Sequence, residues 1–358
     1  MRKPDLDRLL IQDDVSVREA ISAVDRGGVG IALLVDQEGR LLATITDGDI
    51  RRAILHGVSQ DAPVTALLGN RSEDYRKPIA ASTWAKRSEI LHMMQQRNVR
   101  HVPLLDAEQR LVDLVLLSEF ACQPRNRLSA VVMAGGLGTR LRPLTQDVPK
   151  PMLPVGGRPV LERIVEQLRE AGINSVRVAT NHRAEKIIEH LGDGRRFGVQ
   201  IDYPSEDEPL GTAGALGMVE PSDWPLLVVN GDVVTKLNFR SMLDFHQEHG
   251  ADLTVAVRKY EFCVPYGVVE SEGVKVLGLV EKPSLGFFVN AGVYVMEQSA
   301  HREIPLSRRS DMTDLIQILL GNGQSVVSFP IHEYWLDIGH LEDYRQAQED
   351  AESGRLEE

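Results

Sequence analysis

A cluster of glycines followed by two basic residues is the first part of this sequence that could do chemistry. The apolar run 130–134 leads into the letters GGLGTR, which end at Arg140, and Lys150 follows between two prolines. Glycines at the end of a strand let the main chain approach an anion closely, and backbone N–H groups beside fixed cations favour phosphate. We therefore expect a polyphosphate site with Arg140 and Lys150 as its catalytic cations. The predicted nucleotide-binding turn comprises Ala134, Gly135, Gly136, Gly138 and Thr139.

This turn differs from the two best-known phosphate-binding loops. No Lys-Ser or Lys-Thr pair follows its last glycine, as a Walker loop requires, and Leu141 lies where the dinucleotide fingerprint would have a third glycine. A purely structural turn is the alternative interpretation. The arginine, the Lys-Pro pair and a second proline–glycine cluster at 154–159 all favour the phosphate site over that alternative.

Two aspartates follow apolar runs at positions typical of a strand that ends in a turn. Asp232 closes the run PLLVVNGD, and Asp337 lies in the letters WLDIG. A carboxylate at the exit of a parallel strand is well placed to hold a divalent cation against phosphates. We predict Asp232 as a ligand of Mg²⁺, and Asp337 occupies the second such position. Asp-containing turns are common, so each aspartate is a weak signal by itself.

A second glycine loop, SEDEPLGTAGAL, contains Gly211 and Thr212 and precedes a helix expected to begin near Thr212. Its acidic residues bear on which base is bound. Guanine presents two adjacent donors, N1–H and the exocyclic amine, that one carboxylate can accept together, whereas uracil or thymine presents a single donor between acceptors and suits an amide. The acidic run therefore favours guanine, and a solvated acidic loop is the alternative.

Strand and helix patterns alternate from the first glycine turn onward, and these elements must position the groups above. Apolar periodicity predicts a helix over 160–171, a strand over 175–180 and a helix over 183–191. Such alternation favours a parallel sheet that is covered on both faces and binds ligands at the carboxyl ends of its strands. We expect a Rossmann-like α/β domain with a mixed, mostly parallel sheet over 129–350 and a frayed tail over 351–358.

The first third of the chain contains an internal repeat. Its two copies align without a gap, so that Asp36 falls on Asp106 and Arg40 falls on Arg110. Each copy has the pattern of an amphipathic helix, a strand, a polar turn and a second strand, and neither can close a core alone. We expect the copies to pack together as an α+β domain. The predicted bounds are 1–122 for this domain, about 5–57 and about 75–122 for its repeats, and 123–128 for the linker that follows.

Composition excludes several classes of protein. The formal net charge of −12 disfavours non-specific binding to nucleic acid or to an anionic membrane. No apolar run reaches the ~18 residues of a membrane span and no secretory signal is evident, so we expect a cytoplasmic protein. Only two cysteines are present, which argues against a disulfide framework or a thiolate metal site.

The motifs together resemble those of the sugar-1-phosphate nucleotidylyltransferases. GGLGTRLRPLT is followed by PKPMLPVGGRPVLE, EPLGTAGAL, VVNGD, PYGVVE, EKP, NAG and WLDIG in the order of that family, over roughly 129–345. The resemblance implies transfer of a nucleoside monophosphate to a sugar 1-phosphate with release of pyrophosphate, and an Mg²⁺ ion shared by Asp232 and Asp337. It also assigns the sugar phosphate to Lys282, sugar hydroxyls to Glu281 and Asn290, and a close backbone approach to Gly267. The predicted sugar-phosphate site comprises Tyr266, Gly267, Glu281, Lys282 and Asn290.

The family pattern places the base-reading side chain five residues before the glycine of the second loop. That position is Glu206, with Glu208 as its neighbour, and similar acidic runs occur in guanylyltransferases of this family. The sequence thus resembles glucosamine-1-phosphate and mannose-1-phosphate guanylyltransferases, with GTP as the favoured donor. A UTP- or dTTP-using transferase is the alternative, and a non-catalytic, nucleotide-sensing regulatory protein is the alternative from another class.

The N-terminal repeats resemble a pair of cystathionine-beta-synthase-type (CBS) modules, with TITDGDIRR as the best part of the match. The resemblance implies a nucleotide effector whose ribose contacts Thr46 and Asp49, and by analogy a homo-oligomer. Leu116 and Glu119 replace these residues in the second copy, so at most one cleft is equipped. The alternative is a structural or dimer-forming module in which Asp49 is the N-cap of a helix over 50–56.

Overall fold

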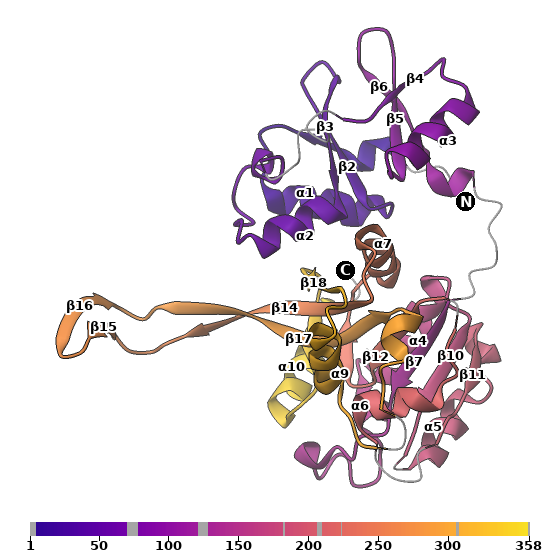
Figure 1. Ribbon diagram of the computed structural model, residues 1–358, viewed down its shortest axis with the longest axis vertical. Coiled ribbons are helices and arrows are strands. Elements are labelled where there is room, and N and C mark those ends of the chain that lie inside the picture. Colours follow the sequence, from indigo (N-terminus) through magenta and orange to yellow (C-terminus); the bar gives the residue numbers. More distant parts are fainter. Residues whose placement is uncertain are drawn as a thin grey trace. The chain divides into compact units, whose positions relative to one another are not determined.

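The structure is a computed structural model that describes residues 5–69, 78–120, 128–181, 183–205, 210–222, 224–305 and 308–356. The chain divides into two compact units, Met1–Asn126 and Arg127–Glu358, coloured along the sequence in Figure 1. Most of the predicted linker lies outside the described residues. Within the described ranges, no helix combines the length and apolarity that crossing a membrane requires.

The N-terminal unit contains two three-stranded sheets of the same design. In each sheet the first strand pairs parallel with the second, and the second pairs antiparallel with the third. The strands are β1 (Leu10–Gln12), β2 (Ile31–Val35) and β3 (Leu41–Thr46) in the first sheet and β4 (Ala81–Ser82), β5 (His101–Leu105) and β6 (Leu111–Leu116) in the second. The helices are α1 (Val17–Gly27), α2 (Asp47–Leu55) and α3 (Arg87–Gln96), with short 3₁₀ turns at Leu6–Arg8, Val64–Leu67 and Leu117–Glu119.

The polar turns of the two sheets pair with each other. Asp36 accepts hydrogen bonds from the backbone N–H of Glu38 and Arg40, and Asp106 does the same in the second turn for Glu108 and Arg110. The Leu41 N–H donates to the Gln109 carbonyl (3.2 Å), and the Leu111 N–H donates to the Gly39 carbonyl (3.1 Å). One apolar cluster then draws on both repeats; it contains Leu9, Ile31, Leu33, Leu114 and Leu116.

The C-terminal unit is built around a seven-stranded sheet in the order β11-β10-β7-β12-β17-β14-β18. Its first four strands are parallel, β17 is antiparallel to both of its neighbours, and β18 is parallel to β14. This mixed, mostly parallel sheet confirms the predicted fold class. The strands are β7 (Ser129–Met133), β10 (Ser175–Ala179), β11 (Gln200–Asp202), β12 (Leu226–Asn230), β14 (Leu253–Cys263), β17 (Ser284–Met296) and β18 (Val326–Ile331).

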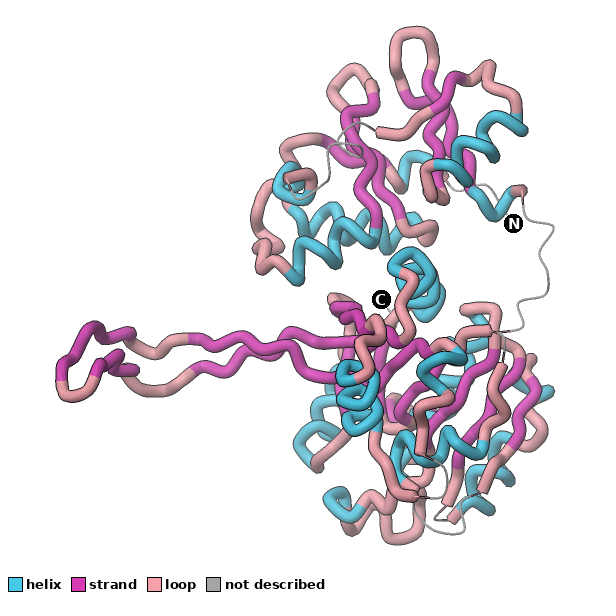
Figure 2. Tube along the Cα trace, viewed as in Figure 1, coloured by secondary structure: helices cyan, strands magenta, loops and turns pink. Residues whose placement is uncertain are grey.

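Both faces of this sheet are covered, because its central strands are apolar on both sides. In β7, Ala130 and Val132 enter one buried cluster and Val131 enters the other. Figure 2 shows the helices on both sides of the strands. They are α4 (Val160–Glu170), α5 (Ala184–Leu191), α6 (Gly211–Gly214), α7 (Phe239–His249), α8 (Gln298–His301), α9 (Met312–Gly321) and α10 (Leu341–Glu352). Short 3₁₀ turns lie at Thr139–Leu141, Lys150–Met152, Arg195–Phe197 and Ala215–Met218, and short strand pairs at β8 (Pro154–Val155) with β9 (Arg158–Pro159) and β13 (Val233–Thr235) with β19 (Trp335–Asp337).

Strands β14 and β17 continue beyond the sheet as a two-stranded ribbon, which ends in β15 (Val268–Glu272) and β16 (Lys275–Val280). Figure 1 shows this ribbon extending away from the body of the unit. Val257 and Ala291 are the last buried residues at its root, and nearly every residue from 259 to 288 is exposed.

A buried histidine on α7 makes the stability of this unit pH-dependent. His246 is 1% exposed, with one ring nitrogen 2.8 Å from the Thr254 hydroxyl and the other 3.3 Å from Glu297. Burial lowers the pKa of His246 to about 4, although the charge of Asp252 acts in the opposite direction. Below its ordinary pKa of 6.5, the His246 imidazole takes up a proton in the unfolded chain, whereas in the folded chain it stays neutral until about pH 4. The free energy of unfolding therefore decreases as the pH falls from about 6.5 towards 4.

We expect this proton to cost the unit up to about 3 kcal/mol at pH 4, taking about 1.4 kcal/mol for each unit of pKa shift. His246→Gln should remove that part of the pH dependence. Hydrogen exchange of α7 and β14 peptides at pH 7, 6 and 5 would measure it locally. An equal loss of protection in wild type and variant would show that His246 does not cause the pH dependence.

Candidate active site

The first glycine turn follows β7, and its shape requires glycine at one position. The Ala134 N–H donates to the Ala179 carbonyl, which fixes the end of the strand. Gly138 has a φ of 60°, and its carbonyl accepts a 2.7 Å hydrogen bond from the Thr145 hydroxyl. A Cβ on Gly138 would lie only 3.0 Å from the Thr145 methyl and 3.3 Å from the Lys150 Cβ. The turn therefore packs directly against the segment that carries Lys150.

The ammonium of Lys150 joins the two predicted metal ligands. Lys150 is 9% exposed, makes a short ion pair with Asp232 and lies 3.8 Å from an Asp337 oxygen. Asp232 follows β12 and lies beside the end of the neighbouring strand β7, because the Gly231 N–H donates to the Met133 carbonyl (2.9 Å). Four charged side chains were predicted for this site from distant parts of the sequence. Lys150 thus contacts two of the other three, Asp232 and Asp337.

The short β13–β19 pair brings the two aspartates together. Val233 lies opposite Asp337 in this pair, and the Ile338 N–H donates to the Asp232 carbonyl (3.1 Å). Burial and the charge of Asp232 raise the pKa of Asp337, while Lys150 and Arg140 act in the opposite direction. The site therefore holds two neighbouring carboxylates whose repulsion a further cation would relieve.

These residues fit a magnesium ion. Mg²⁺ prefers oxygen ligands and is usually bound by one or two carboxylates together with substrate phosphates. Asp232 and Asp337 provide two such carboxylates. Among the residues that the structure describes, no three His, Cys, Asp or Glu side chains form a closed metal cage, which leaves the remaining ligands to phosphate and water.

Arg140 has a neighbour that the sequence did not reveal. Its Nη1 lies 3.4 Å from Nε2 of His340, and the His340 backbone N–H donates to Asp343 (2.7 Å). Asp343 also raises the pKa of Asp337. The available signal was the spacing of a capping box, with His340 before α10 and Asp343 three residues later.

The second glycine loop lies against the start of α9. The Thr212 N–H donates to Asp311 (3.0 Å), the Ala213 and Gly214 N–H groups both donate to the Ser310 carbonyl (2.9 Å), and an added Cβ on Gly211 would lie 2.6 Å from that carbonyl. These donors are therefore engaged within the chain. The predicted base-reading residues Glu206 and Glu208 lie outside the described residues.

The predicted sugar-phosphate residues are divided between the ribbon and its root. Asn290 lies at the root, where its amide donates to the Tyr294 hydroxyl (2.8 Å) and its oxygen accepts from the Gly292 N–H (3.0 Å). Gly292, with a φ of 72°, packs against Asn230, two residues before Asp232. The remaining four predicted residues lie on the exposed ribbon: Tyr266, Gly267, Glu281 and Lys282.

Lys282 is far from the carboxylates of its own chain. It precedes Gly292 by ten residues, which corresponds to roughly 30 Å along an extended strand. Its backbone has a φ of 45°, which is uncommon for lysine. The structure thus brings Lys150, Asp232 and Asp337 together and does not bring Lys282 to them.

In the N-terminal unit, Thr46 and Asp49 contact each other. Thr46 is the N-cap of α2, which begins at Asp47 rather than at residue 50, and Asp49 is its third residue rather than its N-cap. Asp49 is 5% exposed, accepts hydrogen bonds from the Thr46 backbone and hydroxyl, and pairs with Arg52 at 2.8 Å. A nucleotide effector there stays a prediction, which titration of the full chain with AMP, ADP, ATP, GDP and GTP would check.

A cavity of about 460 Å³ lies elsewhere in this unit. It is lined by residues of β1 and α1, among them Gln12, Glu19 and Arg26, and it does not include Thr46 or Asp49.

Comparison with known proteins finds a family match within each unit. The model of the nucleotidyl transferase family matches residues 129–354, which include the glycine turn and both aspartates. The chain belongs to the nucleotidyl transferase family. The CBS domain model matches residues 4–56, which correspond to the first N-terminal repeat. The predicted family resemblance is therefore confirmed.

Relatives within the nucleotidyl transferase family carry a more specific name. Proteins named mannose-1-phosphate guanyltransferase from Yarrowia lipolytica and Aspergillus oryzae are 36% and 34% identical to this chain over 226 and 227 residues. Each alignment covers 61% of this chain and 62% of the relative. The chain thus spans less than two thirds of the length of these curated relatives.

A solved structure from Bacillus anthracis, provisionally assigned as a glucose-1-phosphate thymidylyltransferase, has the same fold. The TM-score is 0.52 at 24% identity, and the match covers 63% of this chain and 95% of the other. At this identity the likeness concerns the fold of the nucleotidyl transferase family and not the substrate.

The raised pKa of Asp337 predicts that this side chain reduces the stability of the metal-free protein. The folded state disfavours the charged carboxylate of Asp337. This side chain therefore lowers the free energy of unfolding at neutral pH, and the effect disappears as the pH falls towards 4. We expect Asp337→Asn to raise the melting temperature in EDTA at pH 7.5 and to lose that gain near pH 4.

Thermal unfolding at both pH values, with and without Mg²⁺, would measure this effect. Asp147→Asn is the matched control, because the Asp147 side chain is 84% exposed. A lower melting temperature for Asp337→Asn in EDTA at pH 7.5 would contradict the prediction.

Proposed function

We propose that this protein transfers GMP from GTP to a hexose 1-phosphate, with mannose 1-phosphate as the first candidate, and releases pyrophosphate. The observation that carries the proposal is the meeting of Lys150, Asp232 and Asp337 at the exit of β7. The names of the relatives support guanine as the base and mannose 1-phosphate as the acceptor.

The reaction requires charge neutralisation more than acid–base catalysis. The attacking oxygen belongs to a sugar phosphate that is largely dianionic at neutral pH, because its second pKa is ≈ 6. This oxygen forms a bond to the α-phosphorus of the nucleotide, the bond between that phosphorus and the bridging oxygen breaks, and pyrophosphate leaves with the electron pair. Repulsion between the two anions is the main obstacle, so positioning and cations should supply most of the rate.

Each charged residue at the site would have its own part in neutralising the phosphate charge. Asp232 and Asp337 would hold Mg²⁺, which neutralises phosphate charge when it is bound. Lys150 lies between the two carboxylates and can turn its ammonium towards the phosphates as charge develops. Arg140, in the glycine turn, presents a second cation to the leaving pyrophosphate.

A matrix of substrates tests the proposal. Pyrophosphate release would be measured for GTP, ATP, CTP, UTP and dTTP, each with mannose, glucose and glucosamine 1-phosphates, with Mg²⁺ and with EDTA. We expect the highest kcat/KM for GTP with mannose 1-phosphate and no turnover in EDTA. A preference for UTP or dTTP would reject guanine. Binding of GTP without release from any pair would favour the nucleotide-sensing alternative.

A further inference from the structure

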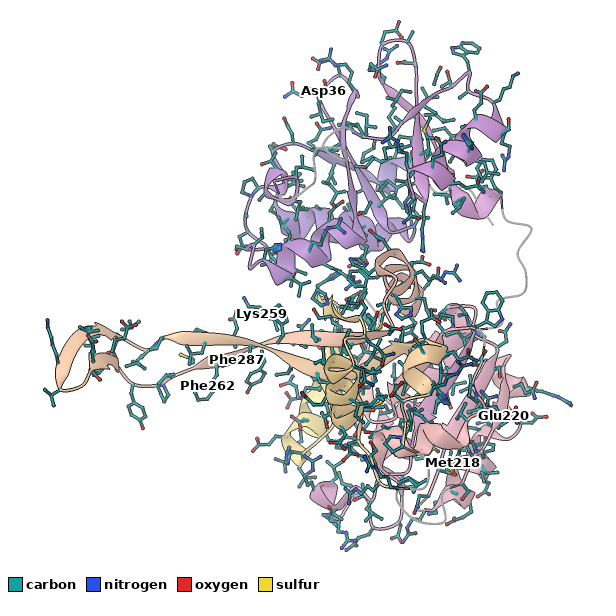
Figure 3. All side chains as sticks on the ribbon, viewed as in Figure 1. Asp36, Met218, Glu220, Lys259, Phe262 and Phe287 are labelled. Carbon is teal, nitrogen blue, oxygen red and sulfur yellow. The ribbon has the colours of Figure 1, made fainter. Side chains whose placement is uncertain are left out.

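The ribbon that leaves the central sheet has two different faces along its stem. Tyr260 lies opposite Phe287 and Phe262 lies opposite Leu285, and paired residues of antiparallel strands point to the same face. The other face carries the Lys259–Glu261 ion pair (2.9 Å), with Phe288 as its apolar exception. Figure 3 shows Lys259 on one side of the ribbon and Phe262 on the other.

The apolar stem face, formed by Tyr260, Phe262, Leu285 and Phe287, is open to water in the single chain. Phe262 is 51% exposed and Phe287 is 57% exposed, and apolar residues of the tip such as Leu279 are similarly open. A two-stranded hairpin by itself is marginally stable at best, and three strands or a packing partner are normally needed. The ribbon therefore requires a surface to cover it.

The exposed area matches what a dimer requires. Each half-exposed aromatic side chain offers about 100 Å², given that such residues bury 150–250 Å² in full. Stem and tip together then offer on the order of 1,000 Å² of apolar surface, and a stable interface takes about 800 Å² from each partner. In a symmetric dimer each copy contributes the same patch, so the apolar stem face can pack against its own counterpart while Lys259 and Glu261 stay in water.

The position of Lys282 on the ribbon indicates where the two-fold axis would lie. Lys282 is displaced from the carboxylates of its own chain, and the buried root of β17 lies at Ala291. The midpoint of this stretch falls at residues 286–287, within the apolar stem face. An axis at that point places Lys282 of one copy at the root of the other copy, where Gly292 packs against Asn230.

We propose that two copies of this chain cross their ribbons at the apolar stem face, and that each ribbon supplies Glu281 and Lys282 to the sugar-phosphate site of the other copy. The part of this inference that concerns the sugar phosphate rests on the proposed function. The crossed dimer rests on the ribbon alone.

Mixing two inactive variants tests the exchange. Asp232→Asn removes a metal ligand from the site, and Lys282→Ala removes the cation from the ribbon; each variant should be inactive when pure. In heterodimers formed by co-expression, the chain with an intact Asp232 receives an intact Lys282 from its partner. About half of randomly formed dimers are mixed and each has one complete site, so activity should recover to about one quarter of wild type.

The control pair is Asp232→Asn with Asp337→Asn, whose mixed dimers have a damaged site in both chains and should stay inactive. If Asp232→Asn with Lys282→Ala also stays inactive while the wild type turns over, each ribbon serves its own chain and the exchange is rejected. If the wild type releases no pyrophosphate from any substrate pair, the proposed function fails, and the crossed dimer is then decided by its mass.

Sedimentation velocity of the full chain measures that mass. We expect a dimer for the wild type and a monomer for Phe262→Ser combined with Phe287→Ser. Lys259→Ser combined with Glu261→Ser, on the opposite face of the same ribbon, is the matched control and should stay dimeric. A monomeric wild type, or a dimer that survives loss of both phenylalanines, would overturn the proposal.

Discussion

Replacing Lys150 with alanine should slow pyrophosphate release from GTP by about 10²-fold to 10³-fold, which is the usual cost of removing one phosphate-directed donor from such a site. Lys150 is nearly buried and lies within 4 Å of both Asp232 and Asp337. Without its ammonium, the two carboxylates lose the cation between them and the phosphates lose a partner. The loss should appear mainly in kcat, because the ammonium is needed most when charge develops on the leaving group.

Two further variants make this result interpretable. Lys150→Arg keeps the charge with a different geometry and should lose less activity than the alanine variant. Arg142→Ala alters an exposed arginine of the same loop and should change activity little. Wild-type turnover in Lys150→Ala would remove this residue from the catalytic machinery.

Replacing Arg51 with alanine should destabilise the N-terminal unit by about 3–5 kcal/mol, because it removes a fully buried guanidinium that pairs with the largely buried carboxylate of Asp47. Arg51 is 0% exposed, and its Nε donates to Asp47 at 2.7 Å, one turn earlier on α2. Loss of the long side chain also leaves a void in the core of the first repeat.

Local hydrogen exchange is the suitable measurement, because a chain of two units need not unfold in one step. Peptides of α1 and β2 should lose protection in Arg51→Ala, while peptides of β7 and β12 should not change. Arg18→Ala is the matched control, since the side chains of Arg18 and of its ion-pair partner Asp61 are 60% and 80% exposed and the pair should contribute about 1 kcal/mol or less. Unchanged protection of α1 in Arg51→Ala would contradict the prediction.

Local patterns were sufficient to predict the sheet and the edge at which charged residues lie, whereas the pairing of Asp232 with Asp337 was implied by the family resemblance. The helix predicted over 183–191 is α5 (Ala184–Leu191), and the strand predicted over 175–180 is β10 (Ser175–Ala179). Parallel strands present their carboxyl ends at one edge of a sheet, so a motif at the end of β7 and another at the end of β12 were expected to be neighbours. Asp232 and Lys150 follow that rule.

Contacts between distant turns could not be predicted in the same way. Thr212 pairs with Asp311 across 99 residues of sequence, and Arg140 approaches His340 across 200. Neither pair shares a periodicity, because each joins a single helical turn to the N-cap of a distant helix, and the positions of these short elements depend on the completed core. Alternation also failed to distinguish a strand within the sheet from a ribbon outside it, since Tyr260 and Phe262 have the spacing of a half-buried strand in either case.

The exchange of backbone hydrogen bonds between Gly39, Leu41, Gln109 and Leu111 limits how the N-terminal unit could be shortened or could have arisen. A single repeat would expose Leu9, Ile31 and Leu33, which Leu114 and Leu116 now cover. An ancestral or engineered half-unit would have to bury these apolar side chains against a second, identical molecule. Duplication and fusion of the two halves would then have converted a concentration-dependent association into an intramolecular one.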